Sequence, residues 1–354
     1  LAVPAKLSTE EERIVTEDSD SLMCGGNRSV DENSMSGRNG GEGLAVEETM
    51  ETEFLQGIYV IQTEADGRFI KRMKEYPTYE EAAGACGVDE EILLLRQEIS
   101  GKSEWYNGLM PPDNLNPESV KTFLKLTHEH YEEVFGGSFP KEVKGFFTDE
   151  PNCCDFFSVF HEGRPWIPWS IGFTEYFIEK RGYDPQEKLP YLFFDGEGAE
   201  KIRHDYWKTV AQRFEESYMK QVYEWCDKRG LRTTGHILYE NDLGYQTRVC
   251  GAAMPQLRYL HNPGIDLLGA QTDEYLTVKQ CASVAHQYDR SMTISEAYGC
   301  TGWELDFSTQ KWLGDWQFAL GITRRCQHLA LYSITGCRKR DLSLIHISEP
   351  TRPY

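Results

Sequence analysis

The chain has 354 residues, 40% of them hydrophobic and 12% aromatic, which is enough to bury the core of one large domain or two smaller ones. A formal net charge of −20 argues against nucleic acid and anionic membranes as partners, because both bind basic surfaces. No apolar run is long enough to span a bilayer and no signal peptide is visible, so we expect a cytoplasmic protein, although a targeting segment could precede Leu1.

The 10 cysteines are scattered along the chain, and only Cys153 and Cys154 are neighbours. No C-x-x-C pair occurs, which argues against a structural zinc site. Buried, reduced thiols are the expected state of these residues.

The N-terminal region, residues 1–54, is predicted to be a flexible acidic linker or insertion. Its stretch 8–54 is polar, acidic and rich in Gly and Ser, so it cannot bury enough apolar area to offset the entropy of ordering. Order is expected to resume over 55–100 as a small accessory α+β segment. There, two apolar runs flank the turn Ala65-Asp66-Gly67 and predict a hairpin, and 90–99 predicts a further strand.

From 101 to 341, short apolar runs alternate with long amphipathic segments, which is typical of a parallel sheet covered by helices. The predicted helices start at Asn116-Pro117 and span 201–228 and 310–327; the predicted strands are 143–147, 231–236, 264–268, 292–296 and 329–334. No Gly-x-Gly-x-x-Gly loop follows a strand, so neither a doubly wound sheet nor a nucleotide cofactor is expected. We predict an α/β fold, an incomplete (β/α)₈ barrel with about six of its eight strands.

Acidic residues follow several of these strands, at the end of a barrel where active sites lie. Glu150, Glu240 and Glu296 lie at or just past strand ends. A glycosidase needs two carboxyl groups across one bond, and aromatic side chains such as Trp303 serve as platforms for sugar rings. The alternatives are a solvated turn or a structural ion pair for each acid, and a core position for each tryptophan.

Five segments together resemble glycoside hydrolase family 106, an α-L-rhamnosidase-like family. They keep the family's order and lie at residues 144–152, 234–236, 263–266, 295–303 and 331–341. The resemblance implies a (β/α)₈ catalytic barrel, an inverting mechanism, calcium dependence and an oligosaccharide or glycoconjugate substrate. It makes Glu150 the general acid and Glu296 the general base. The neighbouring carboxylate of Asp149 would help to raise the pKa of Glu150.

Further residues are candidates for substrate binding. His236 and Glu240 follow one strand and would bind sugar hydroxyls, with Glu240 also a tentative calcium ligand; a core histidine and a solvated acid are the equal alternatives. Asp149 and Trp303 lie beside the predicted acid and base. Arg338 and Arg340 would form a loop on the substrate side after the last strand, although a charge run is usually a solvated face.

Residues 342–354 are expected to be an artefact, because 342–352 resemble a translated sequencing adapter; the chain would then be a fragment, and inactive alone. Two other functions remain open from the sequence. One is another barrel glycosidase, for example a β-galactosidase-like enzyme. The other is a barrel that binds carbohydrate without catalysis, because a fold by itself does not imply activity.

Overall fold

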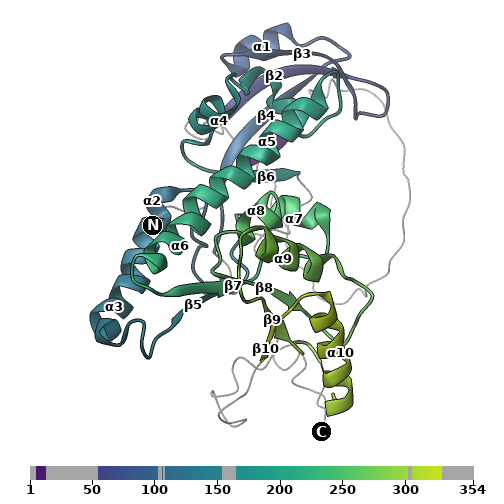
Figure 1. The fold of residues 1–354 in the computed structure, drawn as a ribbon. Coiled ribbons are helices and arrows are strands. Elements are labelled where there is room, and N and C mark those ends of the chain that lie inside the picture. The colour runs from purple at the N-terminus through teal and green to yellow at the C-terminus, as the bar shows by residue number, and fades with distance from the viewer. Residues whose placement is uncertain are drawn as a thin grey trace, which may run out of the picture.

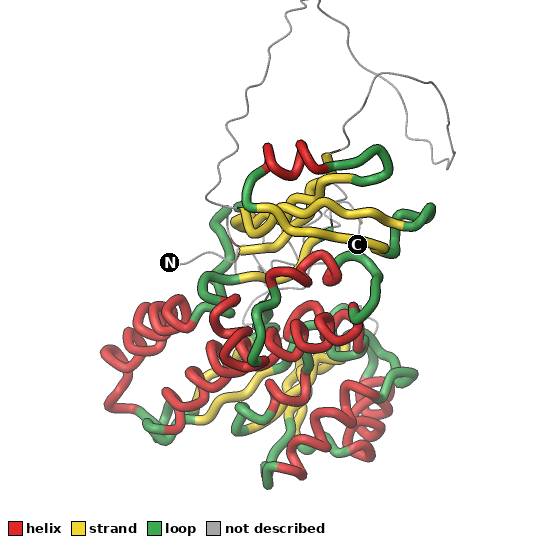
Figure 2. Tube along the Cα trace, turned by 90° about the horizontal axis from the view of Figure 1, so that it is seen from above, coloured by secondary structure: helices red, strands yellow, loops and turns green. Residues whose placement is uncertain are grey.

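The computed structural model describes the backbone of residues 5–12 and residues 55–102, 106, 108–153, 165–301 and 305–328. These residues form two five-stranded sheets, one antiparallel and one parallel (Figure 1). Seen from above, helices lie between the antiparallel sheet and the strands of the parallel sheet (Figure 2). No helix among the described residues has the length and apolar character needed to cross a membrane.

The antiparallel sheet contains the predicted hairpin, formed by β2 (Leu55–Thr63) and β3 (Ile70–Tyr76), and the predicted strand β4 (Glu91–Ile99). Side chains alternate between the two faces of a strand. In β4, Ile92 and Leu94 pack with Ala82 of the unpredicted helix α1 (Tyr79–Ala85), whereas Leu93 and Leu95 join the main core. Because both faces of β4 are buried, its sequence contains an uninterrupted apolar run.

Strand β1 (Ala5–Glu12) differs from the predicted flexible linker of residues 1–54. Its backbone pairs with β4, from Ala5 opposite Ile99 to Glu12 opposite Ile92, and with β6 (Trp166–Trp169) on its other side. Backbone hydrogen bonds do not depend on side-chain polarity, so composition alone does not reveal such a strand. Residues 13–54 lie outside the described residues.

The parallel sheet has the strand order β10-β9-β8-β7-β5 and curves as part of a barrel. Its strands are β5 (Gly145–Thr148), β7 (Arg232–Gly235), β8 (Asn262–Leu267), β9 (Ile294–Ala297) and β10 (Arg324–Gln327). All neighbouring strands are parallel. The predicted partial barrel is therefore confirmed, with five strands in the described part of the chain.

Helices connect these strands. They are α2 (Pro117–Leu124) and α3 (His130–Phe135) before β5; α4 (Phe173–Arg181), α5 (Ala199–Phe214) and α6 (Lys220–Asp227) before β7; α7 (Leu243–Cys250) and α8 (Ala253–Leu257) before β8; α9 (Leu276–Gln287) before β9; and α10 (Phe307–Leu320) before β10. The predicted helix start is confirmed, because Asn116 caps α2 and its side chain accepts the N–H of Glu118. Two π-helical turns, η3 (Lys125–Glu129) and η6 (Glu215–Met219), interrupt the helices α2–α3 and α5–α6.

The last predicted helix is wrong at its C-terminal end. The sequence predicts a helix over 310–327 and a strand over 329–334, but α10 ends at Leu320 and Arg324–Gln327 is already strand β10. Gly321 has φ 118°, a conformation that glycine adopts easily, and it ends the helix. Residues 329–334 lie outside the described residues.

One hydrophobic core joins the two sheets. It includes Tyr59 and Leu93 of the antiparallel sheet together with Phe214 of α5 and Ile265 of β8. The Tyr59 hydroxyl also donates a hydrogen bond of 2.7 Å to the carbonyl oxygen of Gln186. The accessory segment 55–100 is thus packed against the residues that carry the parallel sheet.

Candidate active site

Acidic and imidazole side chains meet at the carboxyl end of the parallel sheet. Asp149 and Glu150 follow β5 and His236 follows β7, whereas Asp266 and Glu296 lie opposite each other within β8 and β9. The carboxyl ends of parallel strands share one edge, so residues distant in the sequence come together there.

Close approach of the strands at this edge depends on Gly235. Its φ is 148°, and a Cβ at this position would lie 2.0 Å from the carbonyl oxygen of Thr148. Thr148 is opposite Gly235 in the sheet register and directly precedes Asp149. A side chain at 235 would therefore push β5 and β7 apart just below the acids.

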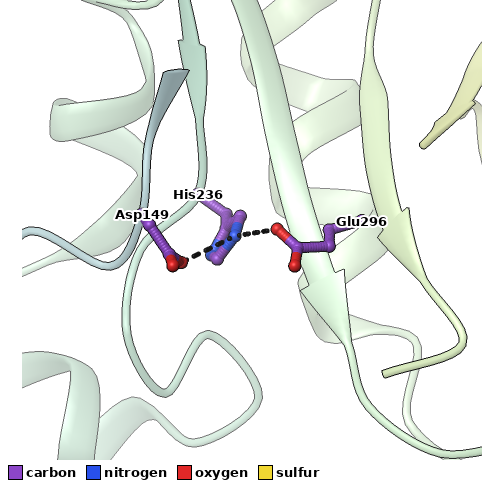
Figure 3. Close-up of side chains that lie close together, drawn as sticks. All are labelled: Asp149, His236 and Glu296. Carbon is purple, nitrogen blue, oxygen red and sulfur yellow. Dashed lines mark hydrogen bonds and ion pairs between the residues drawn. The ribbon is translucent and has the colours of Figure 1, made fainter. Parts of the chain in front are cut away.

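His236 lies at the centre of the cluster (Figure 3). Its Nε2 is 2.9 Å from Oε2 of Glu296 and 3.3 Å from Oδ1 of Asp149, and its side chain is 1% exposed. Burial by itself would lower the pKa of His236, but the Glu296 hydrogen bond and the surrounding carboxylates raise it to about 9. A protonated imidazole thus balances part of the negative charge at neutral pH.

Glu296 has a second imidazole partner. Nε2 of His328, which follows β10, lies 3.3 Å from Oε1 of Glu296. The hydrogen bond from His236 holds the pKa of Glu296 below its ordinary value, because it stabilises the ionised carboxylate.

Glu150 has the opposite environment. Burial, with the nearby charges of Asp149, Asp266 and Glu296, raises its pKa to about 7, and His236 only partly offsets this. Its φ is 47°, an uncommon conformation for a residue other than glycine. Tyr239 and Tyr298, just past β7 and β9, also have positive φ values, of 55° and 75°. Such backbone strain gathers at functional sites.

Two sets of residues could hold a cation. One is Asp149, His236 and Glu296, and the other is Glu150, His236 and Asp266; within each set the candidate ligand atoms lie within 4.8 Å of one another. Oδ1 of Asp266 is buried and has no hydrogen-bond partner among the described residues. Burial, with the charges of Glu296 and Asp149, raises the pKa of Asp266 to about 6 against the opposing effect of His236.

Glu240 is buried, and its carboxylate is already bonded to the backbone. It is 5% exposed, and its carboxylate accepts the backbone N–H of Ile237 at 3.1 Å and of Asp266 at 3.0 Å. Burial raises its pKa to about 8. These contacts tie the segment after β7 to β8, and the burial of Glu240 shows that the alternative of a solvated acid is wrong.

The structure therefore brings together Asp149, Glu150, His236 and Glu296 of the residues predicted from sequence. Trp303, Arg338 and Arg340 lie outside the described residues. Sequence reasoning did not single out Asp266 or His328 as site residues. Asp266 closes the motif at 263–266 on a predicted strand, which was a usable signal, whereas His328 was hidden because 310–327 was predicted as helix.

Comparisons with known proteins bear on the fold. No protein-family model matches the chain, and no curated protein matches it significantly. Among solved structures, the chain is similar to that of the rhamnosidase from Novosphingobium sp. PP1Y, with a TM-score of 0.55 and 20% sequence identity. The match covers 71% of this chain and 24% of the rhamnosidase, so the chain spans about a quarter of that protein. At this identity the likeness shows a shared fold.

Proposed function

We propose that this chain carries the general acid and general base of a glycoside hydrolase that cleaves terminal α-L-rhamnosyl or related deoxy-sugar linkages with inversion. The observation that carries the proposal is the pair of carboxyl groups at one sheet edge, with Glu150 after β5 and Glu296 on β9, both grouped around His236. The fold shared with a rhamnosidase supports a sugar substrate.

The two acids differ as an acid–base pair requires. Glu150, with its raised pKa, would hold a proton near neutral pH and donate it to the glycosidic oxygen as the bond breaks. Glu296, kept ionised by His236, would remove a proton from a water that attacks the anomeric carbon from the opposite side. A pair of like residues driven to different charge states by their surroundings is the usual mark of such an assignment.

Calcium dependence, which the family resemblance implies, would involve Asp266. Its buried and unpartnered Oδ1 is a hard oxygen donor of the kind that Ca²⁺ prefers. A bound ion would supply positive charge for sugar hydroxyl groups. We expect Ca²⁺ to raise the melting temperature of the chain and Asp266→Asn to reduce that rise, with Asp306→Asn on the exposed N-cap of α10 as the control; an unchanged rise in Asp266→Asn would exclude this ligand.

The proposal is tested in the full-length protein with an alkyl α-L-rhamnoside, whose leaving oxygen requires protonation, and with the variants Glu150→Gln and Glu296→Gln. Each should lower kcat by roughly 10²–10⁴-fold, the usual contribution of a general acid or base. Glu133→Gln, on an exposed face of α3, is the matched control and should keep full activity. Near-normal turnover in either site variant would remove that residue from the mechanism.

Two other outcomes distinguish the alternatives. Turnover of a β-galactoside in preference to the rhamnoside would change the substrate while keeping the two acids. Sugar binding by calorimetry without turnover of any nitrophenyl glycoside would indicate a carbohydrate-binding barrel. The anomeric configuration of the first product, read by proton NMR, tests inversion directly.

A further inference from the structure

The carboxylate of Glu296 is held at both oxygens by imidazole nitrogens from two different strand ends. His236 Nε2 lies 2.9 Å from Oε2, and His328 Nε2 lies 3.3 Å from Oε1. The side chains of Glu296 and His328 are 12% and 24% exposed, so solvent screens these contacts only in part. The carboxylate shares a hydrogen bond with His236 Nε2, and His328 Nε2 lies at ion-pair distance from its other oxygen.

Neighbouring residues limit the movement of both rings. The N–H of His328 donates to the carbonyl oxygen of Ala297 at 2.9 Å, which extends the β9–β10 ladder past its last paired residues. A Cβ on Gly299 would lie 2.9 Å from Leu268 and 3.7 Å from Cγ of His328, so glycine lets the segment after β9 pass beside the ring. His236 is buried and its ring contacts Phe147 edge-on, with the ring centroids 5.5 Å apart.

We infer that His328, acting with His236, is a positioning residue for the general base. This inference rests on the proposed function. A base that activates water must present one oxygen lone pair toward the attacking water and stay ionised. One hydrogen bond and one close imidazole contact, on opposite oxygens, restrict rotation of the carboxylate, and each oxygen keeps a lone pair for the water. Groups held in this way before the reaction need no reorganisation during it.

The kinetic experiment compares His328→Ala, His328→Gln and the wild type in the full-length protein. Removal of the imidazole in His328→Ala should lower kcat by about tenfold or more with KM within about twofold, because the contact acts on the base and not on bound sugar. A glutamine amide reaches about as far as Nε2 and should recover much of the loss. His130→Ala, which removes an exposed histidine–glutamate pair on α3, should behave as the wild type. Unchanged kcat in His328→Ala, or a loss that appears only in KM, would overturn the inference.

A second measurement reads the contact without turnover, so that failure of the inference and failure of the proposed function can be told apart. In ¹⁵N-labelled chain, long-range proton–nitrogen NMR should show a protonated Nε2 on His236, and Glu296→Gln should shift the ring signals of both His236 and His328. If the full-length wild-type protein cleaves no glycoside, the proposed function fails and the positioning role falls with it, even where the NMR contact is present. If the wild type is active but Glu296→Gln leaves the His328 signal unchanged, the positioning inference alone is overturned.

Discussion

His128 shows how a single buried side chain links pH to the stability of this fold. It is 6% exposed, its ring stacks on Phe146 of β5 at 4.2 Å between centroids, and it meets Trp225 edge-on. Its Nε2 is buried without a hydrogen-bond partner among the described residues. Burial, aided by the nearby charge of Arg229, lowers the pKa of His128 to about 4.

This lowered pKa predicts a loss of stability in mild acid. The folded state favours neutral His128, with a pKa of about 4, whereas an unfolded histidine has a pKa of 6.5. The stability contributed by neutral His128 is therefore complete above pH 6.5 and is lost as the pH falls from about 6.5 toward 4, by roughly 3 kcal/mol. Urea unfolding at pH 7.5 and 5.0 should show a smaller decrease in His128→Gln than in the wild type.

His130→Gln is the control, because His130 is two residues away and its side chain is 71% exposed. That variant should keep the wild-type dependence of the free energy of unfolding on pH. An equal acid-induced decrease in His128→Gln and the wild type would show that other groups are responsible.

At the scale of elements, the two π-helical turns both support strand β5, which leads into Asp149 and Glu150. From η3, His128 stacks on Phe146; from η6, the Tyr218 hydroxyl is 2.9 Å from the hydroxyl of Thr148. Turns of this kind inside α-helices occur frequently at functional sites. Here they place two side chains on the strand that positions the proposed acid.

Gly235, at the end of β7, predicts a large loss of stability when even a methyl group is added. Gly235→Ala should lower the free energy of unfolding by roughly 2–4 kcal/mol, because the methyl group would meet the Thr148 backbone and the φ of 148° would be strained. Chemical denaturation followed by circular dichroism measures this. Gly84→Ala in α1, where nothing lies within 4 Å of the added Cβ, should instead stabilise the chain by about 0.5–1 kcal/mol. Equal effects of the two substitutions would contradict the steric argument.

Elements with strong local signals were predictable from sequence. The turn at Ala65-Asp66-Gly67, the cap Asn116 and the alternation of short apolar runs with helices gave the hairpin, a helix start and the class of sheet. Strand β10 has no such signal, because Arg324–Gln327 is fully polar apart from Cys326 and every residue in it is exposed. Its strand state comes from pairing with β9. Local propensity does not report such a tertiary contact.

The candidate site was predictable only in part, because it also depends on contacts between strands that are distant in the sequence. Glu150 and Glu296 stand out because each follows or ends an apolar strand. The shared contact with His236, and the pairing of Glu296 with His328, depend on which strands are neighbours in space. The same distinction applies to Glu240, whose position after a strand suggested a ligand, although its oxygens accept backbone N–H groups.

For the whole molecule, a single core spans the antiparallel sheet, the helices and the parallel sheet. A second contact between the two parts is the parallel bridge between Phe69, just before β3, and Asp195, before α5. Changes in the antiparallel sheet are therefore expected to reach the candidate site through shared packing. The small sheet is therefore expected to contribute to the stability of the parallel sheet that carries the candidate site.

We predict that the molecule can be divided into two polypeptides at strand β1, which lies between β4 and β6. Among the described strands, β6 is paired with β1 alone, so the eight residues of β1 complete the sheet between β4 and β6 by backbone contacts. Such contacts can be supplied by a separate strand, as in β-strand addition. A chain lacking residues 1–12 should bind a synthetic peptide of that sequence with saturable recovery of tryptophan fluorescence, because Trp169 of β6 is buried.

A peptide carrying Leu7→Pro should bind far more weakly, because proline removes a ladder hydrogen bond. Identical fluorescence and stability of the shortened and complete chains would show that β1 does not hold β6. If the peptide restores the shortened chain, residues 1–12 can serve as a detachable tag. A protein fused to this peptide would bind the shortened chain only when the antiparallel sheet has folded.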